Sequence, residues 1–145
     1  MSTPTTGPGR VTARPALRVA LIGIEVFVAV GAVYGGVGLI ADNAIGMLPE
    51  WLARTPFATW LWPGILLLLI VALPMATAAS AEIARRSWAF AASALAGSAQ
   101  IGWIVAQWLI VQRYFVLQPI MLACGIAVLI LAGVVHGRVL GFARS

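Results

Sequence analysis

The chain has 145 residues, of which 62% are hydrophobic and only 9% are charged. Soluble domains carry about a quarter charged residues, so this composition excludes a water-soluble globule and indicates a protein embedded in lipid. The net charge is +5 and all nine basic residues are arginines, but they lie at the edges of apolar segments without interleaved aromatic residues. This pattern favours contact with a lipid bilayer and argues against a nucleic-acid partner.

The N-terminal part predicts a disordered tail followed by a first transmembrane helix. Residues 1–16 are rich in Ser, Thr, Pro and Gly and offer too little apolar surface to order themselves. Residues 19–40 are apolar except for Glu25. As a helix they cover roughly 33 Å, enough for a hydrocarbon core of about 30 Å. The segment is longer than the apolar region of about 7–15 residues in a signal peptide, so we expect it to be retained.

The connection between the first two spans, residues 42–59, predicts a short helix at the membrane interface. Pro49 suits the first turn of a helix, and residues 48–54 mix apolar and charged side chains as interfacial helices do. Trp51, Trp60 and Trp62 are typical of the aromatic belt at headgroup level.

Three further apolar segments predict three more spans. Residues 61–80 form the second, with a kink expected near Ile70 because Pro74 removes a backbone donor. Residues 88–112 and 116–137 form the third and fourth, and 139–145 form a second tail. The predicted fold is an all-α membrane four-helix bundle over residues 17–138.

The arginines predict the orientation of this bundle. With four spans, the two ends of the chain and the 81–87 connection share one face, which holds seven arginines: Arg10, Arg14, Arg18, Arg85, Arg86, Arg138 and Arg144. The opposite face holds two, Arg54 and Arg113. Cytoplasmic loops of membrane proteins carry the excess of basic residues, so we expect both termini in the cytoplasm.

The candidate site centres on Glu25, which we expect roughly 10 Å inside the bilayer and pointing into the bundle. Ser93, Gln100 and Gln107 recur every seven residues and therefore share one face of the third span, as does Trp103. Ser93 and Thr77 are expected nearest to Glu25 in depth, with Gln100 roughly 10 Å away. The predicted polar site is Glu25, Thr77, Ser93, Gln100, Trp103 and Gln107.

Two interpretations of Glu25 stay open. It is either a hydrogen-bonded packing residue, reached by Arg18 or Arg85, or a proton or cation site that drives transport. Gly31 and Gly35 have the spacing of close helix contacts, within one bundle or between two copies.

The remaining reactive residues predict no further site. His136 is expected to cap carbonyl groups or meet headgroups, and Cys124 to pack as a small apolar residue. One His and one Cys exclude a closed His/Cys metal site and an intrachain disulfide. No motif indicates a cofactor, and no catalytic constellation indicates an enzyme.

Residues 55–64, Thr-Pro-Phe-Ala-Thr-Trp-Leu-Trp-Pro-Gly, together with Gly102-Trp103-Ile104, Gln107 and Leu117-Gln118-Pro119, resemble a group of uncharacterised small bacterial four-span membrane proteins. The resemblance covers roughly residues 18–135 and implies an architecture in a bacterial cytoplasmic membrane, but no activity. That group has an acidic residue near the place of Thr59, which is absent here. The number of spans and the glycines of the first span are also similar to those of DoxX-like proteins.

The sequence thus favours a non-enzymatic membrane module or accessory subunit, packed against a second copy or another membrane protein. The alternative is a small proton-coupled transporter that uses Glu25. A glutamate in the first of four spans resembles that of small multidrug-resistance transporters, although the long 42–59 connection departs from their pattern.

Overall fold

The computed structural model describes residues 9–43, 45–112 and 114–137, with the backbone alone over 9–13. These residues form helices and no strand. In chain order the elements are α1 (Gly9–Ile40), the 3-10 helix η1 (Pro49–Leu52), α2 (Leu61–Leu67), the π-helix η2 (Leu68–Ala72), α3 (Leu73–Ile83), α4 (Ala89–Val111) and α5 (Leu117–Val135).

Four helices among the described residues are long and apolar enough to cross a membrane. They are Arg14–Ile40 within α1, Leu61–Ile83 formed by α2, η2 and α3 in succession, Ala89–Val111 and Leu117–Val135. The prediction of an all-helical chain with four helices of membrane-spanning length is therefore confirmed. Such lengths follow from the apolar runs of about 20 residues that a helix needs to traverse lipid.

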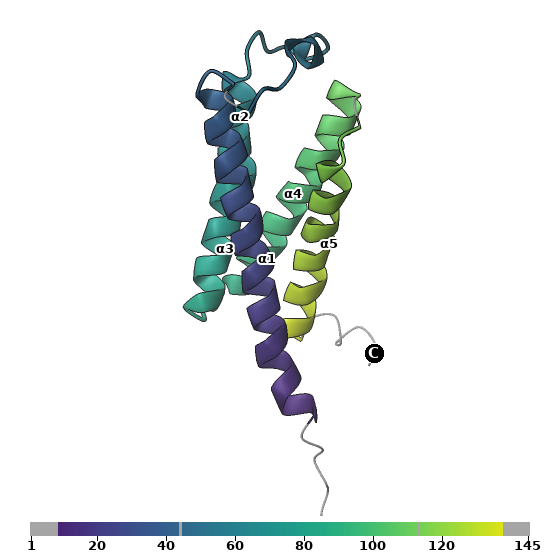
Figure 1. The fold of residues 1–145 in the computed structure, drawn as a ribbon. Coiled ribbons are helices and arrows are strands. Elements are labelled where there is room, and N and C mark those ends of the chain that lie inside the picture. The colour runs from purple at the N-terminus through teal and green to yellow at the C-terminus, as the bar shows by residue number, and fades with distance from the viewer. Residues whose placement is uncertain (1–8, 44, 113, 138–145) are drawn as a thin grey trace, which may run out of the picture.

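The helices run side by side as an elongated bundle (Figure 1). α1 packs against α2, η2, α3 and α5, while α4 packs against η2, α3 and α5. We call the end with the start of α1, residues 84–88 and the end of α5 the terminal end. The opposite end, with residues 41–43, 45–60, 112 and 114–116, is the loop end.

The start of α1 differs from the sequence-based expectation. α1 begins at Gly9, so the tail predicted to be disordered over 1–16 is helical from residue 9 onward. The helix includes Pro15, and the other residues of 13–18 are alanine, leucine and arginine, which are good helix formers. Residues 1–8 and the predicted tail 139–145 lie outside the described residues.

The connection at the loop end contains η1, a single 3-10 turn with Pro49 at its first position. Proline is favoured there because the first amide groups of a helix have no partner within it. The second span has the π-helix η2 directly before Pro74, around the place where the sequence predicts a kink. A π-helical turn is one way in which a helix accommodates the backbone donor that proline lacks.

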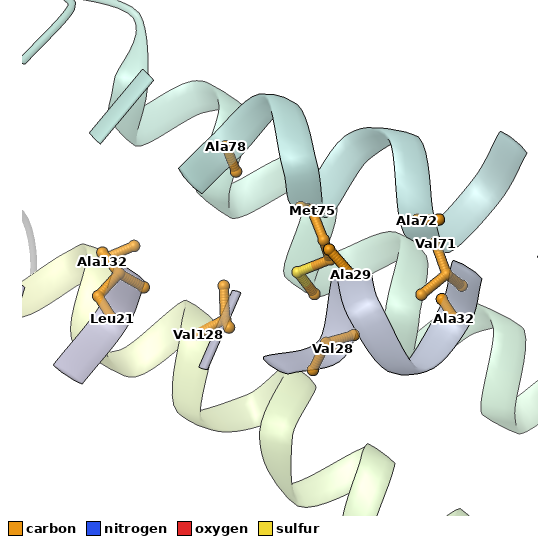
Figure 2. Packing of buried hydrophobic residues seen from close by; sticks show 11 residues of the cluster. Leu21, Val28, Ala29, Ala32, Val71, Ala72, Met75, Ala78, Val128 and Ala132 are labelled. Atoms are coloured by element: carbon orange, nitrogen blue, oxygen red, sulfur yellow. The ribbon is translucent and has the colours of Figure 1, made fainter. Parts of the chain in front are cut away.

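The core of the bundle consists mainly of small side chains (Figure 2). α1 contributes Leu21 and Val28 with two alanines, and the second span contributes Val71 and Met75 with two more. Small residues let helices in lipid approach closely. The closest approaches are made by Gly36 with Gly64 and by Gly97 with Gly125, where an added Cβ would lie 2.8–3.3 Å from the partner glycine's carbonyl oxygen.

The predicted close contact at Gly31 and Gly35 is only partly present. Gly35 faces Leu67, whose Cδ2 would lie 3.3 Å from an added Cβ, whereas nothing lies within 4 Å of the corresponding position on Gly31. Close packing of α1 therefore falls one residue later, at Gly36.

Candidate functional site

Glu25 lies on the buried face of α1. Leu21, Val28 and Ala29 are four residues before it and three and four after it, and all are buried core residues. Side chains at these spacings share one face of a helix, so the packing of this face against α3 and α5 carries Glu25 inward. Its side chain is fully buried, with a fractional exposure of 0%.

Ser93 on α4 joins Glu25 to a second buried carboxyl group. Its hydroxyl donates to Glu25 Oε1 at 2.6 Å, and the same oxygen lies 3.2 Å from Glu82 Oε1. Both Ser93 and Glu82 are fully buried. A hydroxyl has one proton and two acceptor lone pairs, so Ser93 can donate to one carboxyl group while it accepts from the other.

Glu82 is the principal member of this cluster that the sequence-based prediction missed. Residues 81–87 were expected to form a short basic connection after a span that ends at residue 80. Instead, α3 continues to Ile83 and keeps Glu82 on the face that carries Met75, Ala78 and Ala79. Those residues precede Glu82 by seven, four and three positions, the periodicity of one helix face. That spacing is the signal in the sequence that could have placed Glu82 inside the bundle.

Two basic side chains at the terminal end contact Glu82. His136 Nε2 lies 2.8 Å from Glu82 Oε1, and Arg18 Nε lies 3.5 Å from Glu82 Oε2. The imidazole ring also packs edge-on against Phe90, with 5.7 Å between ring centroids. Two expectations are corrected here: Arg18 pairs with Glu82 and not with Glu25, and His136 contacts a buried carboxyl group rather than capping carbonyls.

Glu25, Ser93, Glu82 and His136, here called the carboxyl cluster, come from all four spanning helices. Glu25 belongs to α1, Glu82 to α3, Ser93 to α4, and His136 follows the last residue of α5. Their contacts form a continuous hydrogen-bonded chain from Glu25 to His136. The cluster can therefore both hold the helices together and connect a buried carboxyl group to the terminal end.

The supply of hydrogen-bond donors limits the charge that the carboxyl cluster can hold. Glu25 Oε2 and Glu82 Oε2 are buried without a hydrogen-bond partner in the described part of the chain. If both carboxyl groups were ionised, one hydroxyl would lie between two negative charges, with Arg18 as the permanently charged partner at 3.5 Å from Glu82. Glu82 also has His136 Nε2 at 2.8 Å, whereas Ser93 is the side-chain partner that the described residues provide for Glu25. One bound proton removes a charge and supplies a further donor, so the geometry suits a pair of carboxyl groups that shares a proton.

The chemistry of a hydrolase does not fit this arrangement. Ser93, His136 and Glu82 are residue types of a catalytic triad, but here the carboxyl group lies between the hydroxyl and the imidazole. In a triad the imidazole contacts the hydroxyl and removes its proton. The structure gives Ser93 no such contact with His136 among the described residues.

Thr77 does not belong to the site. Its side chain is exposed on the outside of the bundle, and its hydroxyl donates to the Leu73 carbonyl at 2.8 Å. This local bond to the backbone four residues earlier satisfies the threonine without a partner on another helix. The expectation was based on depth, which does not determine the direction of a side chain around its helix.

Gln100, Trp103 and Gln107 lie apart from the carboxyl cluster, beside a cavity of about 240 Å³ in the loop-end half of the bundle. Gln100 is 2% exposed; its Nε2 donates to the Met121 carbonyl at 3.3 Å, and its Oε1 has no hydrogen-bond partner. The four residues predicted to share one face of α4 are thus divided. Ser93 belongs to the carboxyl cluster, and Gln100, Trp103 and Gln107 line the cavity.

A hydrophobic layer separates the cavity from the carboxyl cluster. Val28 and Val71 line the cavity and also belong to the buried core. Val28 lies three residues after Glu25 on the same face of α1, a rise of about 4.5 Å. The cavity therefore ends about one helical turn from the buried carboxyl group.

No family model, curated protein or solved structure matches this chain. The resemblance to small bacterial four-span proteins therefore stays a prediction from the sequence.

Proposed function

We propose that this chain is a small proton-coupled membrane transporter, in which a proton on the Glu25–Glu82 pair controls access to the cavity at the loop end. The observation that carries the proposal is the hydrogen-bonded chain from Glu25 through Ser93 and Glu82 to His136. Polar chains of this kind inside a membrane bundle are a recurrent feature of proton relays.

The proton path is set by the order of the contacts. A proton on His136 Nε2 passes to Glu82 Oε1 at 2.8 Å. Ser93 Oγ then accepts that proton from Glu82 and gives its own to Glu25 Oε1, 2.6 Å away. The net change is one proton moved from the imidazole to Glu25, with Ser93 unchanged. Arg18 holds the remaining negative charge of Glu82 near the terminal end.

The arginine asymmetry supports an orientation for this cycle. Seven arginines on the terminal side against two on the loop side favour a cytoplasmic terminal end and an external loop end. In that orientation the carboxyl cluster exchanges protons with the cytoplasm, and the cavity lies in the outer half of the bundle. The bacterial cytoplasmic membrane is the proposed location, on the strength of the sequence resemblance.

Proton flux into vesicles tests this function. Purified protein in liposomes with a trapped pH-sensitive dye is subjected to a pH step, with valinomycin and K⁺ to collapse the membrane potential. Glu25→Gln keeps the size of the side chain and removes the titrating group, so flux is expected to fall to that of empty liposomes. Glu50→Gln, on the exposed η1 turn, is the matched control and is expected to keep full flux. Flux in Glu25→Gln equal to wild type would refute the proposal.

The second candidate is the non-enzymatic membrane module, in which the carboxyl cluster serves only to hold the bundle. It is favoured by one observation: the cluster takes one residue from each spanning helix and is sealed from the cavity by Val28 and Val71. In that case Glu25→Gln changes the unfolding temperature in detergent, and wild-type liposomes show no proton flux above empty ones.

A further inference from the structure

Two residues that line the cavity at the loop end each have a buried polar atom with no hydrogen-bond partner among the described residues. Gln100 Oε1 is an acceptor and Trp60 Nε1 is a donor, and both residues line the cavity. Buried polar groups are nearly always hydrogen-bonded, so two such atoms without partners in residues that line one cavity require an explanation. A bound molecule that satisfies them is such an explanation.

The rest of the wall determines what kind of molecule fits. Among the described residues the lining includes no Arg, Asp, Glu or His, so none of these side chains would compensate an ionic ligand. Most of the wall is aliphatic, with aromatic rings from Trp51, Trp103 and Phe115. An apolar wall with few polar groups is the usual composition of a site for a neutral small molecule.

The volume limits the size of that molecule. The cavity measures about 240 Å³. An engineered cavity of roughly 150 Å³ holds benzene, and sites for drug-sized ligands begin at roughly 300 Å³. A molecule with one or two fused rings therefore fits.

The mouth of the cavity is held by contacts across the loop end. An Arg54 Nη1 group donates to Gln112 Oε1, and Trp51 packs edge-on against Phe115 with 6.3 Å between centroids. These contacts join residues 45–60 to the end of α4 and the start of α5. Trp51 and Phe115 also line the cavity, so both segments contribute to its wall at the loop end.

We infer that this cavity is a binding site for a small, neutral, mostly apolar ring compound that donates a hydrogen bond to Gln100 Oε1. The Trp60 indole N–H provides a second point of attachment for a ligand that also carries an acceptor. That the ligand is the transported molecule rests on the proposed function, whereas the binding itself does not.

Two isosteric probes test the inference. Indole has an N–H donor, and benzofuran has the same shape without it. Equilibrium dialysis of the full chain in a fixed detergent concentration measures saturable binding of each. Wild type is expected to bind indole about tenfold more tightly than benzofuran, the ratio that one well-placed hydrogen bond supplies. Gln100→Leu is expected to reduce indole binding to the level of benzofuran.

Gly31→Leu is the control for the location of the site. Gly31 lines the cavity and nothing lies within 4 Å of an added Cβ, so leucine enters the empty space without a clash. Leucine is also a better helix former than glycine, so the fold is expected to persist. Binding of both probes is expected to fall at least tenfold in this variant.

The inference is overturned if wild type binds the two probes equally, if saturable indole binding is absent, or if Gly31→Leu binds indole as wild type does. Its failure is separable from that of the proposed function. Proton flux that depends on Glu25 without indole binding would refute only the ligand site, and indole binding with flux indifferent to Glu25→Gln would refute only the transporter.

Discussion

The Ser93 hydroxyl oxygen lies 2.6 Å from Glu25 Oε1, across the interface between α4 and α1. Ser93 is the hydrogen-bond partner that the structure provides for Glu25, and the same hydroxyl lies 3.2 Å from Glu82. The position of one small side chain therefore determines whether two buried carboxyl groups are connected or isolated.

Ser93→Ala is expected to destabilise the bundle by about 1–3 kcal/mol, because it removes the donor to the buried Glu25 carboxyl group and breaks the link between Glu25 and Glu82. Thermal unfolding in mild detergent measures the change. Ser80→Ala is the matched control, since the Ser80 hydroxyl is exposed and bonds only to the Ala76 carbonyl in the same helix. An equal effect of the two substitutions would show that the Ser93 bridge does not stabilise the bundle.

Arg18 and Glu82 form the ion pair that anchors the cluster at the terminal end. Arg18→Met is expected to lower stability because it removes the guanidinium beside a buried carboxyl group. In a background of Glu82→Gln, the same substitution is expected to have a much smaller effect. A double-mutant cycle on unfolding free energies measures this coupling. Purely additive effects of the two substitutions would contradict the pairing.

The orientation is tested by labelling single cysteines in intact cells. In a Cys124→Ala background, Glu50→Cys at the loop end is expected to react with a membrane-impermeant maleimide, and Ser87→Cys at the terminal end to react only after lysis. Both positions are exposed, so the difference reports sidedness rather than burial. Labelling of Ser87→Cys in intact cells, with protection of Glu50→Cys, would reverse the assignment.

The sequence predicted the spanning helices well because each is a long apolar run, and lipid permits few other structures for such a run. It also singled out Glu25 and Ser93, which the structure joins. For Glu25 and Ser93 the signal is a polar side chain within an apolar helix, where it needs a partner inside the bundle.

Glu82 and His136 were missed because they stand at the ends of apolar runs, near Arg85 and Arg138. Polar residues at such positions usually meet headgroups. The spacing of Glu82 from Ala78 and Ala79 indicates an inward direction only if the helix continues past residue 80, as α3 does to Ile83. Thr77 was wrongly included because it was placed by its depth in the membrane, close to that of Glu25, although its side chain points out of the bundle. At about 100° per residue, Thr77 turns away from the face of Ala78 and Met75.

The cavity could not be predicted from the sequence. It depends on how far α4 and α5 diverge from α1 and α2 at the loop end, which Figure 1 shows as separated ribbons there. Such divergence is set by contacts made elsewhere, including the close approaches at Gly97 with Gly125 and Gly36 with Gly64.

The most direct test of the central claim is infrared difference spectroscopy of the protein in lipid as the pH is changed. The account predicts an absorption from the C=O stretch of a protonated carboxyl group that disappears as the pH rises. It is expected to be lost or shifted in Glu25→Gln and in Glu82→Gln and to persist in Glu50→Gln. A spectrum without a protonated carboxyl band, or one that neither Glu25→Gln nor Glu82→Gln alters, would show that the pair does not hold the proton.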